Sequence, residues 1–328
     1  MKNPPQVDKG SAQKEKTKLH PRNKHRSRYD FSKLIVSCPD LSSFVRPNKY
    51  GDESIDFADP KAVIMLNKVL LKHFYGIDHW DIPEGYLTPP IPGRANYIHY
   101  MADLLASKNF GKMPIGPQIN CLDIGVGANC IYPIIGSIEY GWSFIGSDID
   151  PVAIESAGKI VELNPVISKN VELKLQADPQ DYFYNIIDKN QHIDLTICNP
   201  PFHASLAEAQ AGTFRKVKNL SKKKVVKPIK NFGGQSNELW CEGGEKRFVN
   251  KMIRESKKFS ASCYWFSSLI SKESNLKSAY ATLEKVEAAE FKTIPMGQGN
   301  KTSRIVAWTF FDANQQKQWA EKRWGERV

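Results

Sequence analysis

The segment Ile119-Asn120-Cys121-Leu122-Asp123-Ile124-Gly125-Val126-Gly127-Ala128 decides the fold. Residues 119–124 form a short apolar run, which predicts a buried strand. Gly125 and Gly127 then predict a tight turn, and the apolar residues that follow predict a helix through Cys130 and Ile135. Strand, glycine turn and helix, in this order, are how doubly wound α/β proteins bind nucleotide-like cofactors.

The acid within this segment narrows the choice of cofactor. The pattern is not G-x-G-x-x-G, and no P-loop lysine follows it. The carboxylate of Asp123 disfavours a phosphate at the turn but can pair with a cationic group. S-adenosylmethionine carries an ammonium and a sulfonium, so Asp123, Gly125 and Gly127 favour it over a dinucleotide.

Acids also follow the next two predicted strands, residues 143–147 and 171–176. Asp148 is placed to hold ribose hydroxyls, as an acid at the end of a second strand does. We prefer it to Asp150, which precedes a proline and is predicted to cap the next helix. Asp178 is a candidate partner for the amino group of the cofactor's adenine. A solvated loop acid is the alternative for Asp178.

A fourth predicted strand, residues 193–198, runs into Asn199-Pro200-Pro201-Phe202. The two prolines end the strand and stiffen the corner. The Asn199 side-chain oxygen and the Pro200 carbonyl are acceptors for the two hydrogens of an adenine amino group, and Phe202 offers a stacking face. A simple strand-ending turn is the alternative. The position of this corner after a strand, downstream of the glycine turn, favours catalysis by all four residues.

The remaining elements complete the predicted architecture. Further strands are predicted at 262–269, 286–294 and 304–311, of which the last two can form an antiparallel hairpin. A seven-stranded, mostly parallel sheet with that hairpin is the class I, Rossmann-like methyltransferase arrangement. We expect the methyltransferase domain at 111–312, between a helical extension (29–110) and a C-terminal helix or tail (313–328). Arg94 is predicted to open a helix, where the helix dipole does not favour a cation. An outside partner such as a carboxylate is one interpretation, and a surface arginine is the alternative that the residues alone favour.

The formal charge of +11 is concentrated in two segments. Residues 1–28 contain nine Lys/Arg and two acids, and residues 215–230 contain eight Lys/Arg and no acid, so the rest of the chain is mildly acidic. This distribution indicates attachment to a polyanion. We expect a disordered basic arm at 1–28 and a basic loop at 203–237. Their candidate RNA contacts are Arg22, Lys24, Arg26, Arg28, Lys222, Lys223 and Lys224.

Composition also limits the other classes of protein. None of the six cysteines has C-x-x-C spacing and no histidine cluster accompanies them, so neither structural zinc nor a disulfide framework is expected. No apolar run approaches 18 residues, so no membrane span is expected. The sequence predicts a cytoplasmic, reduced, monomeric protein without a metal.

The motifs together resemble a known family, and they are listed here in chain order: His20-Pro21-Arg22-Asn23, Phe57-Ala58-Asp59-Pro60, Arg94-Ala95-Asn96-Tyr97-Ile98, Asp123 to Ala128, Asn199 to Phe202, and Glu242-Gly243-Gly244-Glu245. The chain closely resembles the bacterial 23S ribosomal RNA adenine N6-methyltransferases, which are related to eukaryotic methyltransferase-like protein 16. The likeness runs from about residue 20 to residue 312.

This resemblance implies transfer of one methyl group from S-adenosylmethionine to adenine N6 in ribosomal RNA. It also implies that Arg94 meets the cofactor carboxylate, Gly125 lines its pocket and Asp148 holds its ribose. The eukaryotic relatives carry Glu where Asp148 stands. We expect no counterpart of their C-terminal RNA-binding extension. The arm and the loop are therefore expected to find the RNA.

Two alternatives stay open at this stage. The same corner serves methylation of a protein glutamine amide, although the two basic segments argue against that acceptor. A non-catalytic RNA-binding or assembly factor is the other alternative, and the complete set of cofactor residues argues against it.

Overall fold

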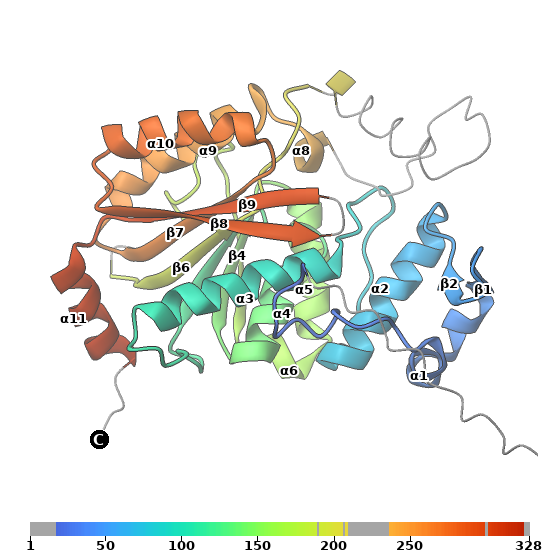
Figure 1. The fold of residues 1–328 in the computed structure, drawn as a ribbon. Helices are drawn as coiled ribbons and strands as arrows, with labels where there is room; N and C mark the ends of the chain where they lie inside the picture. The colour runs from blue at the N-terminus through green and yellow to red at the C-terminus, as the bar shows by residue number, and fades with distance from the viewer. Residues whose placement is uncertain (1–17, 189, 206, 209–235, 299–300, 325–328) are drawn as a thin grey trace, which may run out of the picture.

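The computed structural model describes residues 18–188, 190–205, 207–208, 236–298 and 301–324. At its centre is a seven-stranded sheet in the order β5-β4-β3-β6-β7-β9-β8 (Figure 1). Its strands are β3 (Asn120–Ile124), β4 (Ser143–Asp148), β5 (Val171–Leu175), β6 (Ile193–Cys198), β7 (Cys263–Ile270), β8 (Glu290–Gln298) and β9 (Lys301–Thr309). The predicted architecture is confirmed.

Helices cover both faces of the sheet (Figure 1). One face carries α3 (Ile91–Ser107), α4 (Ile131–Tyr140), α5 (Pro151–Glu162) and the short α6 (Pro165–Ser168). The other face carries α9 (Gly244–Ser256) and α10 (Leu276–Lys285), with the 3₁₀ turns η2 (Lys257–Phe259) and η3 (Glu273–Asn275) beside them. Two buried apolar clusters fill the two interfaces.

The strand directions place the functional site. β3 pairs in parallel with β4 on one side and with β6 on the other, and β6 also pairs in parallel with β7. The carboxyl ends of these strands therefore meet at one edge of the sheet. β9 lies antiparallel between β7 and β8, as the hairpin prediction requires. Its pairing with β8 covers residues 290–298 and 301–309, so the hairpin begins later than predicted on β8.

The N-terminal extension is not wholly helical, which corrects the sequence-based expectation. It contains α1 (Phe31–Ser37), the 3₁₀ turn η1 (Pro39–Ser43), a hairpin of β1 (Val45–Pro47) and β2 (Glu53–Ile55), and then α2 (Pro60–Tyr75). The two strands are three residues long, too short for a periodic apolar pattern. α2 begins after the predicted cap, Asp59, and ends at Gly76 in a left-handed conformation.

Helix α3 begins three residues earlier than predicted, at Ile91, so Arg94 lies within its first turn and does not open it. The proline-rich stretch before Arg94 had indicated a loop. Pro92 is instead accommodated at the helix start, where a missing N–H has no cost.

Residues 18–28 differ from the expected disordered arm, because they pack against α2 and α3. The His20 backbone N–H and the Asn23 side-chain amide both donate to Asn96 Oδ1, at 2.9 Å and 2.7 Å. His20, Asn23 and His25 are all buried. Polar side chains that find buried partners give no apolar signal in a sequence. This explains why the disordered arm was expected to extend to residue 28. Residues 1–17 lie outside the described residues.

The C-terminal helix α11 (Ala313–Trp324) is joined to the start of β6 by one buried carboxylate. Asp194 accepts hydrogen bonds from the indole N–H groups of Trp319 (2.8 Å) and Trp324 (2.9 Å). It also forms an ion pair of 2.6 Å with Arg323 and accepts the Asn120 backbone N–H at 2.8 Å. The aromatic and basic side chains of α11 therefore hold the helix at the edge opposite the strands' carboxyl ends.

Candidate active site

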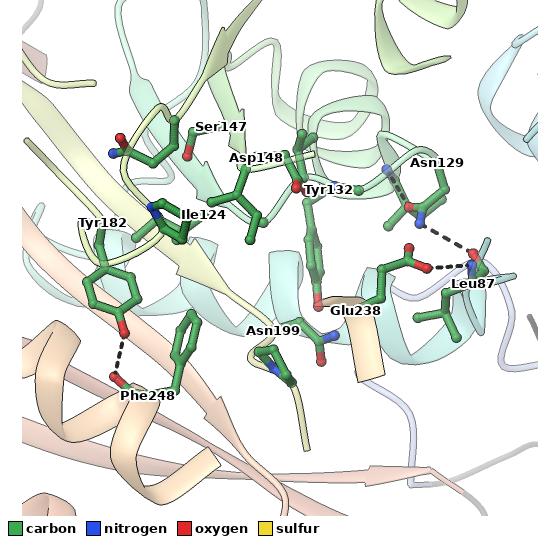
Figure 2. Close-up of a pocket in the computed structure, with 18 of the residues that line it drawn as sticks. Leu87, Ile124, Asn129, Tyr132, Ser147, Asp148, Tyr182, Asn199, Glu238 and Phe248 are labelled. Atoms are coloured by element: carbon green, nitrogen blue, oxygen red, sulfur yellow. Dashed lines mark hydrogen bonds between the residues drawn. The ribbon is translucent and has the colours of Figure 1, made fainter. Parts of the chain in front are cut away.

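The glycine turn after β3 has the backbone conformation that its residues require. Gly125 and Gly127 both have left-handed φ values, of +76° and +66°. The backbone N–H groups of Gly125 and Val126 donate to the Ser147 carbonyl, at 2.8 Å and 2.9 Å. The turn is therefore held against the end of β4, and its two glycines line a cavity at the carboxyl edge of the sheet (Figure 2).

Two buried, oppositely charged side chains lie behind this turn. Asp123 is fully buried, and neither of its carboxylate oxygens has a hydrogen-bond partner among the described residues. Burial raises the pKa of Asp123 well above its usual value, while the charge of Arg94 acts in the opposite direction. Arg94 donates to the Tyr132 hydroxyl at 2.9 Å, but its Nε has no partner among the described residues. Unpaired buried charges are costly, so this pair is suited to a ligand that carries both charges.

The carboxylate of Asp148 is held by the backbone of its own loop and of the turn. Its Oδ2 accepts the Gly127 N–H at 2.9 Å, and its Oδ1 accepts the Asp150 N–H at 3.0 Å. Burial raises the pKa of Asp148, and these two backbone hydrogen bonds act against that rise. Asp150 caps α5 by accepting the Val152 N–H, as predicted.

The corner after β6 is positioned from below by α3 and β7. The Tyr97 hydroxyl of α3 lies 2.9 Å from Ser267 Oγ of β7 and 3.5 Å from the Cys198 carbonyl. Asn199 follows directly, and its buried Oδ1 has no hydrogen-bond partner among the described residues. An amide oxygen without a partner in a cavity is a ready acceptor for an incoming N–H group.

The cavity brings together most of the residues predicted for the site. Its lining includes Arg94, Gly125, Gly127, Asp148, Asn199 and Pro201. Asp123 is buried directly behind the lining, and Pro200 is buried within the corner. Phe202 is half-buried against the apolar core and does not line the cavity.

Asp178 is not in this cavity, which corrects the prediction for that residue. Its side chain is exposed and accepts the Gln180 N–H at 2.8 Å, so it stabilises a turn of its own loop. Gln176, Pro179 and Asp181 line the cavity at this end instead. The turn after β5 directs successive side chains to different sides. The position of an acid after a predicted strand does not show which side that acid faces.

The predicted RNA contacts of the arm already have partners within the protein. Arg22 pairs with Asp103 at 2.6 Å, and Lys24 pairs with Glu139 at 2.8 Å. Arg28 pairs with Asp52 at 2.6 Å, and Arg26 donates to the Pro21 carbonyl at 3.5 Å. These ion pairs are partly exposed, so any polyanion that binds these side chains would compete with them. Lys222, Lys223 and Lys224 lie outside the described residues.

Several lining residues were missed by the sequence analysis. Tyr182 and Phe248 meet edge to face at one end of the cavity, where the Tyr182 hydroxyl donates to the Phe248 carbonyl at 3.3 Å (Figure 2). Leu87, Asn129, Tyr132 and Glu238 surround the other end. These residues come from three separate loops, two helices and a short helical turn, α8 (Ser236–Leu239). No local pattern connects them, so no sequence signal could have assembled them.

Other kinds of site find little support in the described part of the chain. No group of three or more His, Cys, Asp or Glu is arranged there to hold a metal ion. No helix among the described residues is long and apolar enough to cross a membrane.

The sheet is mostly parallel in this strand order, and its strand β9 is antiparallel. The cavity lies between the glycine turn and the Asn-Pro-Pro-Phe corner. This combination defines a class I methyltransferase that uses S-adenosylmethionine. The family model described as RNA methyltransferase matches residues 13–312. The chain belongs to this family of RNA methyltransferases.

The relatives agree with that assignment. A protein of Cytophaga hutchinsonii named ribosomal RNA large subunit methyltransferase F is 60% identical over 309 residues, which are 94% of this chain and 96% of the relative. A protein of the same name from Serratia proteamaculans is 57% identical over 317 residues, which are 96% and 94% of the two chains.

Solved structures show the same fold. The hMettl16 catalytic domain in complex with the MAT2A 3'UTR hairpin 1 superimposes with a TM-score of 0.75 at 29% identity, covering 90% of this chain and 96% of that one. The N-terminal domain of human METTL16 in complex with SAH superimposes with a TM-score of 0.71 at 27% identity, covering 90% and 99%. The predicted fold, enzyme class and cofactor are confirmed.

Proposed function

We propose that this protein methylates N6 of one adenine in 23S ribosomal RNA, in the cytoplasm and as a monomer. The observation that carries the proposal is the partnerless amide oxygen of Asn199 at a rigid proline corner of the cofactor cavity. The names of the relatives support ribosomal RNA as the substrate.

The buried charges support a place for the amino-acid end of the cofactor. Asp123 receives the cofactor's ammonium and Arg94 its carboxylate, which gives a partner to the Asp123 oxygens and to Arg94 Nε. Asp148, already oriented by two backbone N–H groups, accepts the ribose hydroxyls. When bound, the cofactor supplies an electrophilic methyl group on a sulfonium.

The proline corner orients the acceptor. The adenine amino nitrogen is a weak nucleophile because its lone pair is delocalised into the ring. When Asn199 Oδ1 and the Pro200 carbonyl accept its two hydrogens, the lone pair turns toward the methyl group. The same oxygens stabilise the positive charge that develops on N6, and a proton leaves to solvent after the N–C bond forms. Phe202 would stack on the flipped-out base, after a small movement from its present place against the core.

The first test of these roles concerns Asp123. A carboxyl with a raised folded-state pKa stabilises the fold below its unfolded pKa and loses that contribution as the pH rises through the folded value. Asp123→Asn should therefore raise the free energy of unfolding of the cofactor-free protein at pH 7, and weaken S-adenosylmethionine binding tenfold or more. Urea unfolding and titration calorimetry measure both. Asp188→Asn, at an exposed side chain, is the control. Lower stability together with unchanged affinity would disprove the assigned role.

A second test concerns the basic loop. Replacing Lys222, Lys223 and Lys224 with alanine should weaken RNA binding and reduce the slope of log affinity against log salt by about 2, since each phosphate contact on a single strand contributes roughly 0.7. Cofactor affinity should not change. The matched control replaces Lys169, Lys317 and Lys322, which are exposed at the opposite edge of the sheet. Equal slopes for the two triple variants would exclude the loop.

The acceptor itself is tested by mapping N6-methyladenine on ribosomal RNA incubated with the protein and labelled cofactor. We expect one modified adenine in 23S RNA. Label in protein glutamine instead of RNA would overturn the proposal in favour of an amide acceptor.

A further inference from the structure

Glu238 lines the cofactor cavity but does not come from any strand of the sheet. We propose that its carboxylate is a specificity-determining group that makes the cavity prefer the cationic methyl donor over the neutral product. The inference rests on S-adenosylmethionine being the cofactor, and it adds a role for a residue from the far side of the basic loop.

The geometry places this carboxylate over the glycine turn. Glu238 Oε2 accepts the Leu87 backbone N–H at 3.0 Å. A Cβ at Gly127 would lie 3.7 Å from Glu238 Oε1, so the second oxygen approaches the turn closely. In Figure 2 the Glu238 side chain points toward Leu87, at the end of the cavity where Asn129 also lies. Glu238 therefore lines the cavity beside the glycine turn.

The negative charge is not needed for the contact with Leu87. A backbone N–H is satisfied by a neutral amide oxygen as well as by a carboxylate. The charge instead adds to a cavity whose lining already includes Asp148 and Asp181, against the single guanidinium of Arg94 among the described lining residues. This excess of carboxylates suits a ligand with a net positive charge.

The two forms of the cofactor differ by that charge. S-adenosylmethionine has a carboxylate, an ammonium and a sulfonium, which sum to +1. Methyl transfer forms a carbon bond to N6 and breaks the sulfonium S–C bond, whose electron pair stays on sulfur, so the product is neutral overall. A nearby carboxylate in a cavity of low dielectric attracts the donor more strongly than the product, and the attraction falls once the methyl group has left.

Glu238 is also held in place by the catalytic corner. The His203 N–H donates to the Leu239 carbonyl at 3.1 Å, and the Cys241 N–H donates to the His203 carbonyl at 3.1 Å. The segment that follows Phe202 is thereby paired with the segment that carries Glu238. The Glu238 carboxylate therefore keeps a fixed position relative to the proline corner, although a long connection separates the two in sequence.

The experiment compares dissociation constants for S-adenosylmethionine and S-adenosylhomocysteine by titration calorimetry, without RNA. Glu238→Gln keeps an acceptor for the Leu87 N–H and removes the negative charge. We expect about tenfold weaker binding of S-adenosylmethionine and less than a twofold change for S-adenosylhomocysteine. Glu238→Asp, which keeps the charge, should retain the wild-type ratio. Glu242→Gln, at a nearby side chain that is 82% exposed and paired with Arg247, is the matched control and should also retain it.

Equal weakening of both ligands by Glu238→Gln, or no change in either, would overturn the proposal. So would a Glu238→Asp variant that loses the preference as completely as the glutamine variant. Thermal unfolding of each variant verifies that it is folded. Because RNA is absent, failure of the ribosomal RNA assignment leaves this result intact, and a wild-type protein that bound neither ligand would instead refute the cofactor.

Discussion

Asn199→Ala is expected to lower the single-turnover rate of adenine methylation by about a thousandfold. The structure supplies the reason, since the amide oxygen of Asn199 is buried, lines the cavity and has no partner among the described residues. A group already aimed at developing charge needs no reorganisation during the reaction, and removing one such group costs about 10² to 10³ in rate. Loss of the orientation of N6 adds to that figure.

The measurement uses enzyme in excess over RNA and labelled S-adenosylmethionine, so that chemistry is separated from product release. Cofactor affinity, measured by calorimetry, should change less than fivefold, because Asp123, Arg94 and Asp148 remain. Asn199→Asp is the informative companion, since it keeps an oxygen acceptor at the same place and should retain much more activity than the alanine variant. A near-normal rate for Asn199→Ala would remove the corner from the mechanism.

The second large effect concerns stability. Asp194→Asn should lower the free energy of unfolding by about 3–5 kcal/mol, the usual cost of removing one member of a buried ion pair. Asp194 is fully buried and accepts from two indoles, a guanidinium and a backbone N–H. An amide in its place would turn an NH₂ group toward these donors and leave some of them without an acceptor.

Urea and thermal unfolding measure this loss, which corresponds to a fall in Tm of about 6–20 °C at 2–4 °C per kcal/mol. Glu321→Gln is the control on the same helix, because Glu321 is half-exposed and pairs only loosely with Lys317, at 3.7 Å. It should change stability by less than about 0.5 kcal/mol. An Asp194→Asn variant as stable as this control would show that α11 is not held through the buried carboxylate.

The sheet and the centre of the cavity could be predicted because their signals are local. The buried strand, glycine turn and acid of residues 119–127 follow one another in sequence, as do β6 and Asn199. Parallel strands bring their carboxyl ends to one edge, so Gly125, Asp148 and Asn199 meet without further information. The hairpin of β8 and β9 followed from the short connection between two apolar runs.

The errors occurred where a residue's role depends on a distant partner. Basic composition predicted disorder for residues 18–28, but His20 and Asn23 find Asn96 about 75 positions away. Asp178 had the expected place after a strand, and its turn directs it away from the cavity. No role was predicted for Asp194, because its partners lie in α11, far along the chain.

By itself, the sequence determined the class of fold, the kind of cofactor and the corner that presents oxygen acceptors, because strand periodicity, glycine conformation and proline stiffness act over a few adjacent residues. Only the tertiary structure decided which side chains are buried without partners, which charges are already paired and that Glu238 lines the cavity beside Gly127. These properties depend on desolvation and on contacts between segments far apart in the chain, and neither is encoded in the spacing of neighbouring residues.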